Sequence, residues 1–307
     1  MILFTRSIEA IYVLSISALT SSYHFPMSSI IDFHTHIFSD EVKRDRNILL
    51  TKDETLALLY PSPDTKMASV NDLINTMNED GISKSVVMGI GWTDLGLARE
   101  SNDYIIESIN SFPARLIGFA GVNPAWGDGA TSEIERCHSL GLRGVGELHP
   151  DSQGFDITDF ATMAPMMDVV QELDLILTTH SSEPVGHTYR GKGTLWPNKL
   201  IKFIENFPGA KIVCAHWGGG LPFYALMPEV KKAMTNVYFD TAASPFLYEK
   251  EVFQIATNVL GENKILMGSD YGLIRPARLL RQINEASINE RSKKAILGGT
   301  AERLLSL

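Results

Sequence analysis

Short runs of apolar residues alternate with longer amphipathic stretches along the chain from Ile30 onward. The short runs are rich in Val, Ile, Leu and Phe and end at Gly, Pro, Asn or Asp, which is typical of buried β-strands. The longer stretches have the apolar spacing of helices that pack one face against a core. Strands are predicted at 30–34, 84–90, 115–121, 142–147, 175–180, 210–215, 236–240 and 263–268. Helices are predicted at 69–80, 96–112, 130–139, 157–173, 197–207, 222–234, 248–260 and 276–285.

Strands that are each followed by a helix, with no break in composition, predict a single-domain α/β fold, a parallel (β/α)₈ TIM barrel over residues 28–307. An open doubly wound sheet is the alternative. No strand-turn-helix carries GxGxxG, however, and the glycine cluster at 218–220 lacks that spacing. Residues 37–68 form a long loop insertion after the first strand, where a lid or small elements are expected. The tail 286–305 is predicted to add helix on the outside of the barrel.

The composition is that of an ordinary globular protein, with 44% hydrophobic and 21% charged residues among 307. The 27 basic and 36 acidic side chains give a net charge of −9, which disfavours binding to nucleic-acid phosphates. Cys137 and Cys214 are the only cysteines, so neither a disulfide framework nor an all-cysteine zinc site can form. A cytoplasmic location is expected.

The first 27 residues have two interpretations. Arg6 precedes an apolar run at 11–19, which has the form of a short secretory signal. Glu9 and the serines of the run weaken that interpretation, and the run is too short to span a bilayer, which needs ~20 apolar residues. We therefore favour a mis-assigned start, with translation beginning at Met27, over a leader peptide.

Two histidines stand at the end of the first predicted strand. Alternate side chains of a strand share a face, so His34 and His36 can point to one place. Two imidazoles at that spacing can chelate a divalent cation, although two buried histidines without a metal would give the same pattern.

Further imidazoles and carboxylates stand at the ends of four later strands: Glu147, His180, His216 and Asp270, at strands four, five, six and eight. The carboxyl ends of barrel strands meet at one face, which is where barrel active sites lie. The pattern therefore predicts a metal site at that face.

These strand ends resemble the amidohydrolase superfamily. The closer resemblance is to its amidohydrolase-related branch, which includes aminocarboxymuconate-semialdehyde decarboxylase and resorcylate-type decarboxylases. The segments that carry it are Ile-Asp-Phe-His-Thr-His at 31–36, Ala-His-Trp-Gly-Gly at 215–219, Gly-Ser-Asp at 268–270 and Gly-Gly-Thr-Ala at 298–301.

The resemblance implies a metal held by His34, His36, His180 and Asp270. It also implies that His216 is an acid/base group and that Asp270 moves a proton to and from a metal-activated water. The donor types favour zinc, with one or two ions per chain.

The chain departs from the branch in two places. Glu147 stands where the decarboxylases generally lack a bridging carboxylate, and it is interpreted either as a bridge between two metals or as an acceptor that orients a ligand histidine. Thr300 replaces a common Asn, a change expected to affect helix packing.

Four further residues are candidates for contact with a substrate: His149, Arg190, Lys192 and Trp217. Arg190 and Lys192 lie in the loop after strand five and can bind a substrate carboxylate, although a solvated loop is the alternative. Trp217 can form the wall of an aromatic pocket or pack under the next loop. Asp240 at the end of strand seven is expected to order a loop, and Arg275 is a weaker anion-binding candidate.

The chain is thus expected to be an enzyme that acts on a small molecule. The main hypothesis is a metal-dependent hydrolase of an amide, ester or lactone, because Glu147 favours hydrolysis. The alternatives are a non-oxidative decarboxylase of an aromatic or unsaturated acid on the same metal site, and a non-catalytic metal-binding barrel. No nucleic-acid or membrane partner is expected, and a homodimer is possible.

Overall fold

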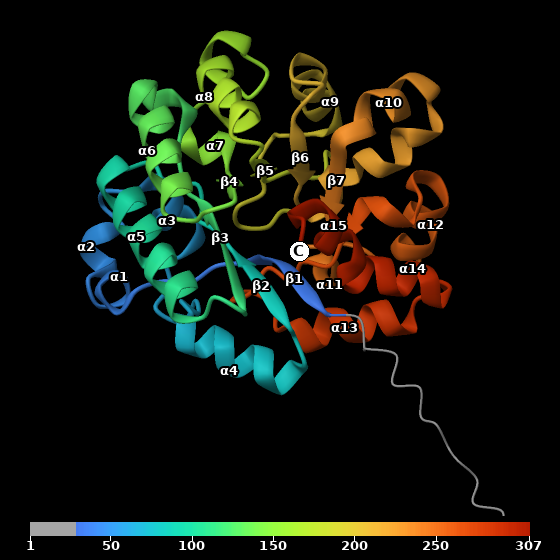
Figure 1. Ribbon diagram of the computed structural model, residues 1–307, viewed down its shortest axis with the longest axis horizontal. Coiled ribbons are helices and arrows are strands. Elements are labelled where there is room, and N and C mark those ends of the chain that lie inside the picture. The colour runs from blue at the N-terminus through green and yellow to red at the C-terminus, as the bar shows by residue number, and fades with distance from the viewer. Residues whose placement is uncertain (1–28) are drawn as a thin grey trace, which may run out of the picture.

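The computed structural model describes residues 29–307, so the interpretations of residues 1–27 lie outside the described part of the chain. Within 29–307, eight parallel strands follow one another around a barrel in chain order (Figure 1). The strands are β1 (Ile31–Thr35), β2 (Lys84–Val87), β3 (Leu116–Ala120), β4 (Gly144–Leu148), β5 (Ile176–Thr179), β6 (Lys211–Cys214), β7 (Val237–Asp240) and β8 (Ile265–Leu266).

Backbone hydrogen bonds between β1 and the segment that follows β8 bring the two ends of the sheet together. The Phe33 N–H donates to the carbonyl of Met267 at 2.7 Å, and the Asp270 N–H donates to the carbonyl of His34 at 2.9 Å. The predicted (β/α)₈ barrel is confirmed, and the open doubly wound sheet is excluded.

Helices surround the strands (Figure 1). The α-helices are α1 (Asp40–Arg44), α2 (Arg46–Leu49), α3 (Glu54–Leu59), α4 (Val70–Asp80), α5 (Leu95–Ser111), α6 (Asp128–Ser139), α7 (Pro150–Gln153), α8 (Phe160–Glu172), α9 (Pro197–Asn206), α10 (Pro228–Ala233), α11 (Ser244–Leu247), α12 (Glu251–Leu260), α13 (Pro276–Glu285), α14 (Glu290–Lys294) and α15 (Thr300–Leu305). Shorter 3₁₀ or π segments are η1 (Pro124–Trp126), η2 (His216–Leu226), η3 (Met234–Asn236), η4 (Glu262–Lys264) and η5 (Ala295–Gly299).

The long insertion and one predicted helix differ in detail from expectation. Residues 37–68 fold into α1, α2 and α3, joined by irregular chain. The helix predicted at 222–234 is divided, because η2 ends at Leu226 and α10 starts at Pro228. Proline lacks a backbone N–H and is best placed at the first position of a helix, so the chain starts a new helix there.

One apolar cluster fills the barrel interior. It joins side chains of six strands, β1, β2, β3, β5, β6 and β8, to Leu304 and Leu305 of α15. This packing closes the barrel at the end where α15 lies and leaves the carboxyl ends of the strands for polar side chains. No helix within 29–307 is both long and apolar enough to cross a bilayer.

Candidate metal centre

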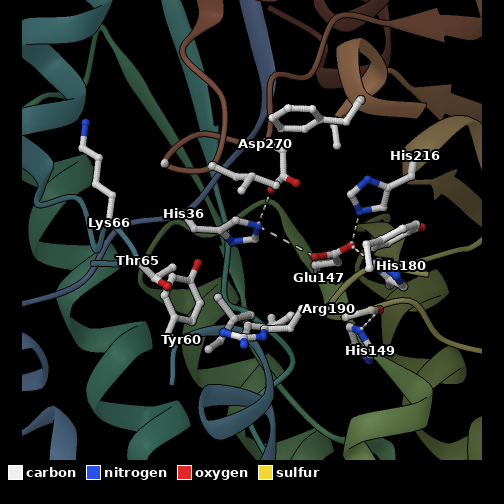
Figure 2. Close-up of a pocket in the computed structure, with 18 of the residues that line it drawn as sticks. His36, Tyr60, Thr65, Lys66, Glu147, His149, His180, Arg190, His216 and Asp270 are labelled. Atoms are coloured by element: carbon white, nitrogen blue, oxygen red, sulfur yellow. Dashed lines mark hydrogen bonds and ion pairs between the residues drawn. The ribbon is translucent and has the colours of Figure 1, made fainter. Parts of the chain in front are cut away.

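Side chains from five strand ends converge at the carboxyl face of the barrel. They are His34 and His36 of β1 and the segment after it, Glu147 of β4, His180 after β5, His216 after β6 and Asp270 after β8, all of them at most slightly exposed except Asp270, which is partly exposed. All but His34 line a cavity of about 830 Å³ (Figure 2). The prediction that these residues share one face is therefore confirmed by their positions.

Hydrogen bonds fix the orientation of the two β1 histidines. Nδ1 of His34 lies 2.8 Å from Oδ2 of Asp240, and Nδ1 of His36 lies 3.2 Å from the carbonyl oxygen of Met88. Since both partners are acceptors, each Nδ1 carries the proton in the neutral ring. Nε2 of each ring is then left with a lone pair.

The two Nε2 atoms face each other and two carboxylates. They lie 3.1 Å apart, and Oδ1 of Asp270 is 3.5 Å from Nε2 of His36. Oε2 of Glu147 is 3.5 Å from Nε2 of His34. Four acceptor atoms at these distances repel one another unless a positive charge lies among them, so the residues fit a divalent cation.

Two groups of donors lie close enough to bind such an ion. One consists of His34, His36 and Asp270, and the other of His34, Glu147 and His216. In each group the ligand atoms lie within 4.8 Å of one another. Because His34 belongs to both, the groups describe one continuous centre.

The buried histidines and carboxylates of the centre strongly shift one another's pKa values. Burial alone would lower the pKa of His34, but the carboxylates of Asp240 and Glu147 raise it well above its usual value. Burial would raise the pKa of Glu147, but His34 and hydrogen bonds with His180 and His216 hold it well below its usual range. Glu147 is therefore ionised, and the negative field that favours a proton on His34 equally favours a metal cation at Nε2 in place of that proton.

His216 is held between a carboxylate and a carbonyl. Its Nε2 lies 3.3 Å from Oε1 of Glu147, and its Nδ1 lies 3.2 Å from the carbonyl oxygen of Ala242. Burial lowers the pKa of His216, but Glu147 outweighs it and raises the value to about 9. Glu147 thus favours the protonated form of His216 at the floor of the cavity.

A tight turn after β6 brings His216 to this place. Residues 216–220 all have positive φ, which glycine adopts without strain and which His216 and Trp217 adopt at 53° and 58°. A Cβ at Gly219 would collide with the backbone carbonyl of Ser182. The glycines therefore let this turn pass close to the loop after β5.

His180 lies beside the centre and contacts Glu147. Its Nδ1 is 3.1 Å from Oε1 of Glu147, its Nε2 is 3.2 Å from Oγ of Ser182, and it belongs to neither donor group. The structure thus brings three of the four predicted metal ligands into one donor group, and the ligand role of all four stays a prediction.

His149 lines the cavity, as expected of a pocket residue. Its ring stacks on His180 at 4.3 Å, and its Nε2–H donates to the carbonyl of Gly191 at 3.1 Å. Burial and the neighbouring His180 lower its pKa to about 4, so the ring is neutral. His149 therefore holds the loop after β5 against the cavity.

The other substrate-contact candidates have different positions. Arg190 lines the cavity, whereas the Lys192 ammonium donates to the carbonyls of Val185 and His187 at 2.7 and 3.0 Å. The Lys192 ammonium thus binds carbonyl groups of its own loop, in contrast to its predicted contact with a substrate carboxylate.

Trp217 and Arg275 lie away from the cavity. Trp217 is fully buried, and its Nε1–H donates to Ser244 at 3.0 Å, so it packs under the following loop rather than forming a pocket wall. Arg275 forms ion pairs with Glu79 and Asp80 outside the cavity and is not available to an anion there.

Sequence reasoning missed several residues of the site. Tyr60 and Lys66 of the insertion line the cavity, although nothing in their sequence context marks them. Asp240 was expected to order a loop, and it also accepts the hydrogen bond from His34. Its place at the end of a strand, like those of the other site residues, was the one available signal.

Comparisons with known proteins agree with the motifs. The family model described as amidohydrolase matches residues 31–307. The 2-amino-3-carboxymuconate-6-semialdehyde decarboxylase of Dictyostelium discoideum is 25% identical over 245 residues, which cover 69% of this chain and 67% of that protein. The gamma-resorcylate decarboxylase of Polaromonas sp. is 24% identical over 249 residues, which cover 68% and 76%.

A solved structure shares the fold. It is a 5-carboxyvanillate decarboxylase of Novosphingobium aromaticivorans, complexed with manganese and 4-hydroxy-3-methoxy-5-nitrobenzoic acid. The TM-score is 0.73 at 18% identity, over 91% of this chain and 96% of that one.

The main functional hypothesis from the sequence, a hydrolase of amides, esters or lactones, is wrong. Both curated relatives are decarboxylases, which agrees with the alternative hypothesis. The inference of hydrolysis from Glu147 failed because this residue sets the charge and the hydrogen bonds of the centre, and neither property specifies which bond of a substrate is broken.

Proposed function

Because the chain belongs to the amidohydrolase family, we propose that it is a metal-dependent enzyme that removes CO₂, without oxidation, from an aromatic or unsaturated carboxylic acid. One observation carries this proposal: His36, Glu147, His216 and Asp270 form the polar floor of a cavity whose other walls include Leu59, Ile90 and Phe246. A volume of about 830 Å³ is ample for a substituted benzoate. The curated relatives support the reaction type.

The donor set described above would hold the cation. When bound there, a divalent ion supplies positive charge that orients an acidic substrate and stabilises developing negative charge. The manganese in the neighbouring structure supports a divalent metal, and zinc stays a prediction from the donor types.

The chain itself must supply and control a proton. In the reaction the bond between carbon and CO₂ breaks, the electron pair stays on the carbon, and that carbon takes up a proton. No oxidant or reductant is needed. The floor presents two groups that can hold this proton, His216 and Asp270, and both line the cavity. Glu147, 3.3 Å from Nε2 of His216, can keep that imidazole protonated and oriented.

Residues of the upper cavity would select and enclose the substrate. Arg190 can bind a carboxylate or phenolate with two parallel hydrogen bonds. Leu247 and Leu273 contribute apolar surface to the cavity. An apolar surrounding disfavours the charged carboxylate and favours its conversion to uncharged CO₂. A small organic acid is therefore the proposed partner.

The test uses the Mn²⁺-loaded chain and a panel of acids that includes 2,6-dihydroxybenzoate and 5-carboxyvanillate. We expect CO₂ release from at least one acid, loss of that release after chelation, and one deuterium at the former carboxyl-bearing carbon when the reaction runs in D₂O. A parallel panel of amides, esters and lactones should stay intact. If the loaded chain releases CO₂ from none of the acids in the panel, the proposal is wrong.

A further inference from the structure

One side chain holds an irregular segment of the insertion against the cavity. Residues 60–66 form no helix or strand, yet Tyr60, Asp64, Thr65 and Lys66 line the cavity. The Arg46 guanidinium of α2 donates to the carbonyls of Tyr60 (2.5 and 2.8 Å), Pro63 (3.4 Å), Thr65 (3.3 Å) and Ser62. Arg46 thus satisfies backbone acceptors that regular structure would otherwise satisfy, and it fixes the course of this segment.

The ring of Tyr60 is also held in place. It packs edge-on against Phe38 with ring centroids 4.8 Å apart, and Phe38 is buried and packs in turn against Trp92. A ring fixed by its backbone and by one aromatic neighbour keeps its hydroxyl in a defined position.

The hydroxyl of Tyr60 makes no hydrogen bond to another side chain or backbone group within 29–307, where the hydrogen bonds of this residue are made by its backbone N–H and carbonyl. Figure 2 shows Tyr60 extending into the cavity toward His36. Burial raises the pKa of this phenol, and the carboxylates of Asp270 and Glu147 raise it further. The group therefore stays protonated and presents its O–H to the cavity as a hydrogen-bond donor.

We propose that Tyr60 is a specificity-determining residue that donates a hydrogen bond to an oxygen substituent of the substrate other than the departing carboxylate. In a substrate of the proposed class, that oxygen belongs to a phenolic hydroxyl or another carboxylate beside the carbon that loses CO₂. This inference rests on the proposed function.

The movement of charge during the reaction indicates why the Tyr60 hydroxyl would bind that second oxygen and not the departing carboxylate. Negative charge leaves the departing carboxylate as the bond to carbon breaks, so a donor bound to it would stabilise the ground state more than the transition state. A donor on a conjugated ring oxygen gains strength as charge moves into the ring.

The test is a binding cycle with two ligands that differ by one oxygen. Calorimetric titration of the Mn²⁺-loaded chain compares 2-hydroxybenzoate with benzoate, for the wild type and for Tyr60→Phe. We expect Tyr60→Phe to weaken binding of 2-hydroxybenzoate about tenfold and of benzoate less than about twofold. Mn²⁺ affinity should be unchanged. Tyr224→Phe, at a half-exposed tyrosine outside the cavity lining, is the matched control and should change neither ligand.

Arg46→Met is the second variant, because it releases the segment but keeps the phenol. It should reduce the preference for 2-hydroxybenzoate over benzoate and leave Mn²⁺ affinity unchanged. Equal losses for both ligands in Tyr60→Phe, or no loss, would overturn the inference. If the cycle shows the expected difference but no acid releases CO₂, the inference stands and the proposed reaction fails. If neither ligand binds the loaded wild-type chain, the inference fails together with the proposed substrate class.

Discussion

Asp240 accepts a hydrogen bond from Nδ1 of His34 at 2.8 Å, and both side chains are fully buried. Its other oxygen accepts from the backbone N–H groups of His216 and Ala242, each at 3.0 Å. One carboxylate at the end of β7 therefore orients a predicted metal ligand and also the backbone that carries the predicted acid/base histidine.

We predict that Asp240→Asn lowers metal affinity about 10- to 100-fold, because the amide no longer fixes the His34 tautomer or raises the basicity of Nε2. The measurement is a competition titration of Mn²⁺ against a chelator of known affinity, with circular dichroism to check the fold. Asp168→Asn, the same change at an exposed position of α8, should leave the affinity unchanged. Equal affinities for Asp240→Asn and wild type would remove Asp240 from the metal centre.

The two proposed proton-carrying residues should separate in their effect on the metal. His216→Ala and Asp270→Asn should each reduce turnover of an identified acid by about 10²-fold or more, since a positioned acid contributes about that much. Asp270→Asn should in addition reduce metal content, because Asp270 shares a donor group with His34 and His36. Elemental analysis and steady-state rates measure the two effects on folded protein. Wild-type turnover in either variant would refute its assigned role.

The loop after β5 offers a matched pair of basic residues. Arg190 lines the cavity, whereas the ammonium of Lys192 is bonded to carbonyls of the same loop. Arg190→Met should raise the KM for the acid about 5- to 10-fold, because a charged hydrogen bond to the substrate is lost. Lys192→Met should change KM by less than about twofold. A larger effect at Lys192 than at Arg190 would contradict the position of both side chains.

Most of the barrel and its polar face could be predicted from the sequence for one geometric reason. Parallel strands of a barrel all end at the same face, so a histidine or carboxylate at a strand end, such as His36, Glu147 or Asp270, can be placed without knowledge of side-chain contacts. Strand ends also carried the resemblance, which the family match confirms.

The sequence could not predict contacts that depend on irregular chain. Tyr60 reaches the cavity because Arg46 holds the segment around it, and neither residue belongs to a periodic pattern. Trp217 and Lys192 each had two open interpretations, and burial or loop carbonyls decided between them. The reaction could not be read from strand ends either, because hydrolysis and decarboxylation can use the same donors.

Gly219 should be far less tolerant of alanine than Gly129. At Gly219, φ is +58° and a Cβ would meet the backbone of Ser182, so Gly219→Ala should destabilise the fold by about 2–4 kcal/mol. At Gly129, in α6, a Cβ would make ordinary contacts of 3.5 and 3.6 Å with Trp126 and Leu95. Gly129→Ala should be neutral or stabilise by up to about 1 kcal/mol. Denaturant unfolding measures both, and equal free energies of unfolding would show that the turn at 216–220 can rearrange.

The number of metal ions follows from the atom that the two donor groups share. Nδ1 of His34 is hydrogen-bonded to Asp240, so its Nε2 lone pair is the one ligand site of this residue and binds one ion. Within 29–307 both groups of three donors include His34, so the two groups cannot each hold an ion at the same time. We therefore predict one ion per chain and a Glu147 that orients His180 and His216 instead of bridging two metals. Elemental analysis after loading with Mn²⁺ and gel filtration should give one ion in the wild type and also in Glu147→Gln. Two ions in the wild type and one in Glu147→Gln would make Glu147 a bridge, and His180 would then be expected to bind the second ion.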